Sequence, residues 1–243
     1  MKKVTTVLSV VNRLPYLNSQ LDSINNQTID SDIFIIWRNR ERYSLSYPCI
    51  IYENESKHFN SLYGRFYNSI HIKTPYVFIV DDDILPGSEY VERCINFSKQ
   101  NNDKVVVCTF GVNFASGETK YNPVFRVDQN LFLDNPLQVD MGGQGWFMKT
   151  ELLYYFLFQP PVDLTTGEDL HFSYCLFKNN IPIYVLDKDK NNSKTWQDIG
   201  LGKRGEDDKA QWKTNPNHFP VRDKLMEIYT SSGWEFKSKK TVI

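Results

Sequence analysis

The chain has 243 residues, of which 41% are hydrophobic and 23% are charged. This composition is ordinary for a globular protein and excludes a disordered or fibrous chain. Lys and Arg number 28 and Asp and Glu number 29, so the net charge of -1 excludes nucleic-acid binding through bulk positive charge. The length allows one large or two small domains. Because no repeat or separating linker occurs, we expect a single domain over residues 1–243.

The cysteines and the hydrophobic segments bear on location. Cys49, Cys94, Cys108 and Cys175 form no CxxC pair, which favours free thiols in a reducing, cytoplasmic compartment, although spacing alone leaves disulfides possible. No apolar run reaches the ~18 residues of a transmembrane helix. The apolar run 4–11 follows two lysines as a signal peptide would, but it is short and rich in β-branched residues. We interpret it as the first strand.

Strand and helix patterns alternate through the first half of the chain. The apolar segments expected to be strands are residues 4–11, 33–37, 50–52, 76–80 and 105–108. Between them, apolar residues at helical spacing predict helices around residues 17–24, 59–70 and 91–97. This alternation predicts crossover connections and an α/β fold with a mostly parallel central sheet flanked by helices.

The second half is less regular. Residues 113–122 are polar and predict a loop or hairpin tip, and the glycines of 142–145 predict a flexible turn before a strand at 146–148. Further elements are expected as helices at 151–158 and 170–177 and as a strand at 183–186. The segment 187–210 is rich in Lys, Asn, Gly and Asp and is expected to be mobile. Pro220 is expected to open a last helix, because proline suits a first helical turn.

Three consecutive carboxylates, Asp81, Asp82 and Asp83, follow the apolar segment 76–80. Open α/β sheets bind ligands beyond the carboxyl ends of their strands. Mutual repulsion among the carboxylates requires a compensating cation, and a hard divalent ion with oxygen ligands would supply it while bridging diphosphate oxygens. The alternative is an acidic turn, since Asp is common in turns. The buried strand before the triplet favours a metal or nucleotide site.

A second acidic segment, Thr166-Gly167-Glu168-Asp169, precedes an apolar helical pattern. Thr166 and Asp169 have the spacing of a capping box, and acidic side chains are favoured in a first helical turn. A carboxylate at the rim of a cleft could instead position an acceptor hydroxyl or accept its proton. Both interpretations stay open, with Asp169 the first catalytic candidate and Glu168 the second.

The glycine-rich segment between Asp140 and Trp146 is a third candidate. Glycine lets the backbone approach a ligand closely, and Trp146 could stack on a sugar ring. We therefore interpret Asp140, Gly143 and Trp146 as candidate acceptor-binding residues. The alternative is a plain turn that enters a strand carrying a core tryptophan.

Isolated polar residues complete the candidates. Arg13 and Asn39 each follow a predicted strand directly, which makes them candidate nucleotide contacts, and Asn60 and Arg65 lie on the helix before the Asp strand. His218 could be a late metal ligand, although a lone histidine is more often structural. No GxSxG, HExxH, P-loop or GxGxxG motif occurs, which argues against serine hydrolases, zinc proteases, NTPases and dinucleotide-binding enzymes.

In chain order these segments resemble nucleotide-sugar-dependent glycosyltransferases of the GT-A fold, and most closely the exostosin-like glycosyltransferase family 64. The segments that carry the resemblance are Val11-Asn12-Arg13, Ile36-Trp37-Arg38-Asn39, Asn60-Ser61-Leu62 with Arg65-Phe66, Val80-Asp81-Asp82-Asp83 and Gly167-Glu168-Asp169-Leu170. The Glu-Asp segment is also similar to that of the inverting family 2 enzymes. Val10 and Arg38 depart from the family pattern at positions expected to contact the base.

The resemblance implies a Rossmann-like GT-A domain with a nucleotide-sugar-binding half over residues 1–110 and an acceptor-binding half over residues 111–243. It implies that a UDP-sugar donor is held by four polar residues, namely Arg13, Asn39, Asn60 and Arg65. It also implies the transfer of a hexose to a glycan acceptor. The membrane anchor and second domain of animal exostosins have no counterpart in the sequence, so we expect a freestanding soluble enzyme of bacterial or viral type.

The resemblance also implies a role for each of the acidic residues. Asp83 would bind Mn²⁺ (or Mg²⁺) directly, and Asp81 and Asp82 would hold the ribose or metal-bound water, with Asp81 a possible further ligand. Glu168 or Asp169 would face the reacting centre. Family 64 enzymes retain the anomeric configuration and family 2 enzymes invert it, so the stereochemical outcome stays open.

The expected mechanism follows from charge. Cleavage of the sugar–phosphate bond leaves a diphosphate, which a bound divalent ion and basic side chains would neutralise. Lys203 and Arg204 lie in a glycine-bracketed segment and are expected to close over the diphosphate and exclude water. Two other functions fit the sequence less well. A non-catalytic carbohydrate-binding protein would not need the three Asp residues, and a metal-dependent nucleotidyltransferase is disfavoured because residues 12–16 lack glycine.

Overall fold

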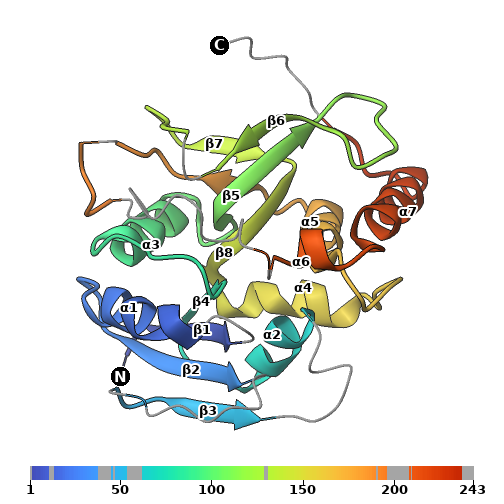
Figure 1. Ribbon diagram of the computed structural model, residues 1–243. Helices are drawn as coiled ribbons and strands as arrows, with labels where there is room; N and C mark the ends of the chain where they lie inside the picture. Colours follow the sequence, from blue (N-terminus) through green and yellow to red (C-terminus); the bar gives the residue numbers. More distant parts are fainter. Residues whose placement is uncertain are drawn as a thin grey trace.

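The computed structural model describes residues 2–10, 14–37, 45, 47–53, 62–128, 131–189, 191–195, 208 and 210–236. Its centre is a nine-stranded sheet of order β3-β2-β1-β4-β8-β5-β9-β7, with β6 paired to β5 (Figure 1). The strands are β1 (Val4–Val10), β2 (Ser31–Trp37), β3 (Ile50–Glu53), β4 (Tyr76–Val80), β5 (Val106–Phe114), β6 (Pro123–Val127), β7 (Leu137–Val139), β8 (Met141–Lys149) and β9 (Ile183–Val185).

Helices cover this sheet. They are α1 (Leu14–Asn25), α2 (Gly64–Tyr67), α3 (Tyr90–Gln100), α4 (Leu153–Phe158), α5 (Glu168–Lys178), α6 (Gln211–Thr214) and α7 (His218–Ser231), with 3-10 turns η1 (Asn68–His71) and η2 (Thr150–Leu152). One core cluster joins α1 and α3 to the sheet, and another joins α2, α4 and α5 to it. Helices therefore cover both faces, which confirms the predicted α/β fold.

The first four strands form the parallel part of the sheet. β1 pairs in parallel with β2 and β4, and β2 pairs in parallel with β3. Every residue of β1 and β4 is buried, as is typical of parallel strands covered on both faces. All four strands therefore end at one edge of the sheet, where Asp81 to Asp83 follow β4.

The remaining strands make the sheet mixed. β8 runs antiparallel to β4 and β5, and β5 runs parallel to β9. β5 and β6 form an antiparallel hairpin whose tip lies within the predicted polar segment 113–122. The continuous parallel part of the sheet therefore ends at β4, where the antiparallel strand β8 begins the mixed part. In Figure 1 the parallel strands lie below and β5 to β7 above, joined through β4 and β8.

The predicted turn at residues 142–145 is wrong, because these residues lie inside the continuous strand β8. A Cβ atom at Gly142 would collide with the sulfur of Cys108 on the paired strand, and one at Gly145 would collide with Thr109. The glycines thus allow neighbouring side chains to pack across the strand rather than providing a bend.

Two predicted helices differ in how well they agree with the structure. The helix expected over 59–70 is only α2 followed by η1 in its described part, and Ile70 is exposed although Phe66 is fully buried. Pro220 is the third residue of α7, as its role in a first turn predicts. Of the segment 187–210, residues 190, 196–207 and 209 lie outside the described residues.

All four cysteines are free thiols. Within the described ranges, no helix is both long and apolar enough to cross a membrane.

Candidate active site

The turn after β4 is held on two sides. The Asp81 backbone N–H donates to the Gln144 carbonyl on β8, at 2.8 Å. From α1, the buried side-chain amide of Gln20 donates to the carbonyl oxygens of Asp81 and Ile84. Ser23, one turn further along α1, donates to the Pro86 carbonyl at 2.6 Å. The acidic triplet therefore sits on a fixed backbone, as a binding site requires.

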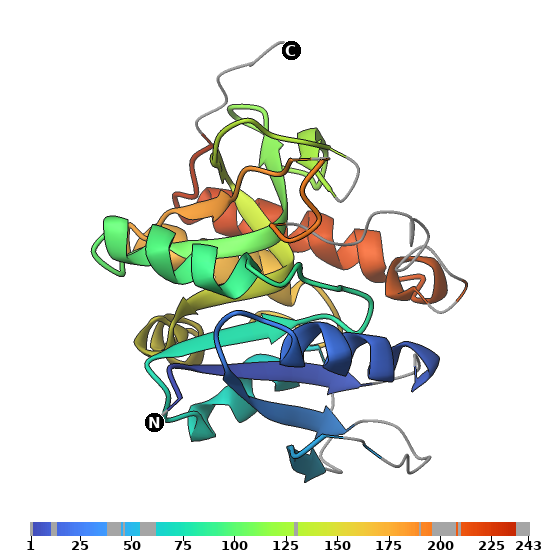
Figure 2. The ribbon, with the colours of Figure 1, turned by 90° about the vertical axis from the view of Figure 1, so that its left-hand side faces the viewer.

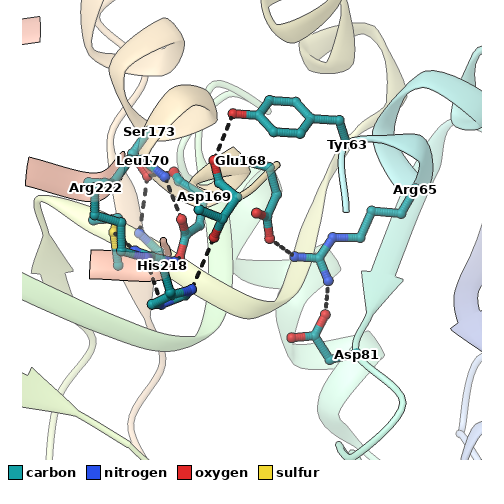
Figure 3. Close-up of polar contacts among 12 residues, drawn as sticks. Tyr63, Arg65, Asp81, Glu168, Asp169, Leu170, Ser173, His218 and Arg222 are labelled. Atoms are coloured by element: carbon teal, nitrogen blue, oxygen red, sulfur yellow. Dashed lines mark hydrogen bonds and ion pairs between the residues drawn. The ribbon is translucent and has the colours of Figure 1, made fainter. Parts of the chain in front are cut away.

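Arg65 connects this turn to the start of α5 (Figure 3). Its guanidinium pairs through Nη1 with Oδ1 of Asp81 and through Nη2 with Oε1 of Glu168, the latter at 2.7 Å. The Arg65 and Glu168 side chains are each only 5% exposed, whereas Asp81 is 25% exposed. Removing one partner of such a buried pair leaves an uncompensated charge, which is strongly destabilising. Arg65 therefore fixes Asp81 and Glu168 relative to each other.

One carboxylate oxygen of Glu168 has no hydrogen-bond partner among the described residues. This atom, Oε2, is buried, whereas Oε1 binds Arg65. Burial raises the pKa of the Glu168 carboxyl and neighbouring Asp169 adds to this, while the cations Arg65 and Arg222 oppose it. A buried polar atom without a partner is costly and needs an explanation. An atom of the substrate at this position would provide one.

Asp169 lies next to Glu168 but binds a different arginine. Arg222 of α7 donates from Nη2 to Asp169 Oδ2 at 2.7 Å, and the Leu170 backbone N–H donates to Asp169 Oδ1 at 2.8 Å. Burial is the largest single influence and alone would lower the pKa of Arg222, but the charge and hydrogen bond of Asp169 together with Tyr121 and Glu168 raise it. The guanidinium lies 4.7 Å from the centroid of the Tyr121 ring. Both oxygens of Asp169 are thus already engaged.

His218 completes this second cluster (Figure 3). Its Nε2 atom accepts from the Arg222 Nε–H at 2.9 Å, so in the neutral ring Nδ1 carries the proton and donates to Thr166 Oγ1 at 3.0 Å. Burial, assisted by the charge of Arg222, lowers the pKa of His218 to about 4. Neither nitrogen then offers a free lone pair. This geometry does not fit the metal-ligand role expected from the sequence.

The predicted capping box is absent as well. The hydroxyl of Thr166 binds His218, and the helix is preceded by Gly167, whose φ of 83° lies in the left-handed region that favours glycine. A Cβ atom at Gly167 would also collide with Leu225 of α7. Glu168 and Asp169 nevertheless occupy the first turn of α5, as predicted.

The three acceptor candidates lie in β8 or directly before it. Trp146 is fully buried, with its ring against Phe66 and Phe172, so it has no exposed face on which a sugar could stack. Its expected stacking role is therefore corrected to one in the core. Gly143 is buried in β8. Asp140 accepts the Phe114 N–H at 2.9 Å, and burial raises the pKa of its carboxyl to about 6 despite that hydrogen bond.

The donor and metal candidates can be placed only in part. Five of them, Arg13, Asn39, Asn60, Lys203 and Arg204, lie outside the described residues. Asp82 and Asp83 lie in the turn after β4, where Asp83 is buried. Within the described part of the chain, no three His, Cys, Asp or Glu residues are grouped closely enough to enclose a metal ion. The oxygen donors instead suit an ion held by one or two carboxylates and completed by substrate phosphates.

Sequence reasoning missed Arg222 and Tyr63. The Tyr63 hydroxyl donates to the Thr166 carbonyl at 3.4 Å, on the segment that leads into Glu168. Arg222 lies four residues after His218, so the two share one face of α7, and this spacing was the available signal. Their partners lie more than 50 residues away in sequence, at separations of 103 and 53 residues.

Part of the chain matches a known glycosyltransferase family. Residues 4–122 match the glycosyl transferase family 64 domain. The match confirms the resemblance predicted from the motifs. It includes Arg65 and the acidic triplet and ends before Glu168.

Solved structures share the fold. S. aureus TarS aligns with a TM-score of 0.55 and 16% identity over 77% of this chain and 35% of that one. S. aureus TarS 1-349 aligns with a TM-score of 0.55 and 15% identity over 77% of this chain and 58% of that one. The chain thus spans less than two thirds of either. No curated protein matches the sequence. The family match and the shared GT-A-like fold together support a glycosyltransferase.

The His218 cluster predicts a loss of stability in acid. The pKa of His218 falls from 6.5 to about 4 on folding, so the unfolded chain binds this proton first and stability falls as the pH drops from about 6.5 towards 4. His171 behaves alike, with its pKa lowered to about 4 by burial. Urea unfolding of His218→Gln should show a smaller loss between pH 7 and pH 4.5, by roughly 1–3 kcal/mol. An unchanged pH dependence in this variant would contradict the assignment.

Proposed function

We propose that the protein transfers a sugar from a nucleotide-sugar donor, a UDP-sugar, to a hydroxyl group of a glycan acceptor, with Mn²⁺ or Mg²⁺ as cofactor. The observation that carries the proposal is the Arg65 bridge, which joins the acidic turn after β4 to Glu168 and leaves Glu168 Oε2 without a partner. The family match over residues 4–122 supports it independently.

The acidic turn is the proposed donor end. Arg65 pairs with Asp81, and Asp82 and Asp83 follow it in the same turn as the proposed ligands of the divalent ion. Ions such as Mg²⁺ are commonly held by one or two carboxylates together with substrate phosphates. When bound, the ion would supply Lewis-acid neutralisation of the departing diphosphate. The Gln20 and Gln144 contacts keep the turn from shifting as the donor binds.

Glu168 is the proposed catalytic carboxylate. Asp169 has both oxygens engaged by Leu170 and Arg222, whereas the buried Oε2 of Glu168 has no hydrogen-bond partner among the described residues. Burial raises the pKa of Glu168, which brings a carboxylate closer to the range in which proton transfer is efficient at neutral pH. Glu168 would orient the acceptor hydroxyl or accept its proton, and Arg65 would hold it in place.

Asp169 then acts as a positioning residue. Its pair with Arg222 anchors the first turn of α5 to α7, and Arg222 is in turn fixed by neutral His218. This chain of contacts restrains the backbone on which Glu168 stands. The five donor candidates outside the described residues, Arg13, Asn39, Asn60, Lys203 and Arg204, remain predictions.

Donor binding should depend on a divalent ion and on Asp83. Calorimetry with UDP and Mn²⁺ should show about a tenfold or greater loss of affinity in EDTA and in Asp83→Ala, because the diphosphate loses its counter-charge. Release of nucleotide from a panel of UDP- and GDP-sugars with Mn²⁺ identifies the donor. Asp134→Ala, at an exposed position, is the matched control and should bind UDP as the wild type does. UDP affinity that is unaffected by EDTA and by Asp83→Ala would contradict the metal-dependent donor site.

The two acidic residues of α5 should differ in their effects. Glu168→Gln should lower kcat by a factor on the order of 10²–10⁴ with donor affinity nearly unchanged, because the amide cannot accept a proton. Arg65 keeps Asp81 as a partner in this variant, so the loss of stability should be moderate.

Asp169→Asn should instead unfold more easily, because Arg222 is left buried without a carboxylate. Its kcat should fall less than that of Glu168→Gln. Kinetics and thermal unfolding of both variants decide between the two residues. Near-normal kcat in Glu168→Gln with a large loss in Asp169→Asn would transfer the catalytic role to Asp169.

A further inference from the structure

We infer that α6 and the first turn of α7 form a carbohydrate-binding surface for the acceptor, in which Trp212 and Phe219 stack on sugar rings. The inference rests on the proposed function, because it names the acceptor side of the same site. It differs from the sequence prediction, which gave this role to Asp140, Gly143 and Trp146.

The two aromatic side chains are exposed, and the helices that carry them lie near the carboxyl edge of the parallel strands. Trp212 of α6 is 45% exposed and Phe219 of α7 is 50% exposed. Figure 2 shows α6 and the start of α7 on the side towards which the arrows of β1 and β2 point. Ligands of open α/β sheets bind at this carboxyl edge.

A continuous series of contacts connects Phe219 to the candidate active site. The Phe219 ring meets the His218 ring edge-on, with centroids 5.1 Å apart, and lies 6.4 Å from the Tyr121 ring. Arg222 lies over Tyr121 and binds both His218 and Asp169. Phe219 is therefore held on its inner side by the residues that anchor α5, and its outer part faces solvent.

Trp212 contacts a cation of its own helix. The Lys213 ammonium lies 5.0 Å from the centroid of the Trp212 ring, a distance at which a cation is attracted to the ring face. Nearly half of the Trp212 residue stays exposed. A rigid aromatic group costs little conformational entropy when a ligand binds, which suits it to be a binding anchor.

The chemistry of these groups favours a carbohydrate. Aromatic rings have an electron-rich face, and a pyranose ring presents weakly polarised C–H groups that pack against such a face. Exposed aromatic groups next to convergent polar side chains are typical of ligand sites. Here the polar groups are those of the active site, so a glycan lying across Trp212 and Phe219 would extend towards Glu168.

Binding of defined oligosaccharides tests the inference. Wild-type protein with UDP and Mn²⁺ is applied to an array of immobilised di- to tetrasaccharides with hexose, N-acetylhexosamine and hexuronic acid ends, and the best-bound sugar is then titrated in solution. Trp212→Ala and Phe219→Ala should each weaken binding roughly tenfold. Trp212→Phe, which keeps an aromatic face, should retain most of the affinity.

Phe158→Ala is the matched control. Phe158 on α4 is 81% exposed and stacks on Tyr154, and it has no place in the site described above. Its oligosaccharide affinity should equal that of the wild type.

Three outcomes would overturn the inference: no oligosaccharide bound by the wild type, unchanged affinity in both α6–α7 alanine variants, or an equal loss in Phe158→Ala. Failure of the proposed transfer is seen separately, as the absence of nucleotide release from every donor in the panel.

Discussion

The candidate site depends on the two ion pairs that the buried guanidinium of Arg65 forms with Asp81 and Glu168. The guanidinium lies buried between the end of β4 and the start of α5, two elements 87 residues apart along the chain (Asp81 to Glu168). One cation there compensates two carboxylates that would otherwise repel each other in a poorly solvated position. Arg65 also connects two parts of the fold. The acidic turn follows a strand of the parallel half of the sheet, and the candidate catalytic carboxylate lies on α5.

Two adjacent acidic residues serve different purposes because each meets a different arginine. Glu168 faces Arg65 of α2, and Asp169 faces Arg222 of α7. The start of α5 is therefore held from both sides, by α2 and by α7. Neutral His218 orients Arg222, and its lowered pKa keeps it neutral over the physiological range. Transfer chemistry needs a carboxylate within a narrow range of positions, and this arrangement limits its movement.

The sequence predicted the parts of the site that depend on local pattern. A buried apolar strand followed by Asp81 to Asp83 identifies a strand end in an α/β sheet whatever the rest of the chain does, and β4 confirms it. The Glu168-Asp169 pair in a first helical turn follows in the same way from local helix chemistry. Both predictions rest on residues that are neighbours in the chain.

The features that the sequence did not predict depend on packing between residues far apart in the chain. The glycines of β8 resemble a turn locally, but their neighbours Cys108 and Thr109 come from another strand. The sequence allowed Trp146 to be interpreted as a sugar-stacking residue. In the fold it is buried in the core, where its ring packs against Phe66 and Phe172. Arg222 and Thr166 show their roles only once α7 lies against α5.

A double-mutant cycle between Arg65 and Glu168 measures whether the two side chains stabilise each other. Arg65→Met, Glu168→Leu and the double variant are compared with the wild type by urea unfolding. The account predicts that Arg65→Met alone costs roughly 3–5 kcal/mol and that the double variant is more stable than the sum of the single losses by at least about 1 kcal/mol. Losses that add within about 0.5 kcal/mol would show that the two side chains do not stabilise each other, and would contradict the account.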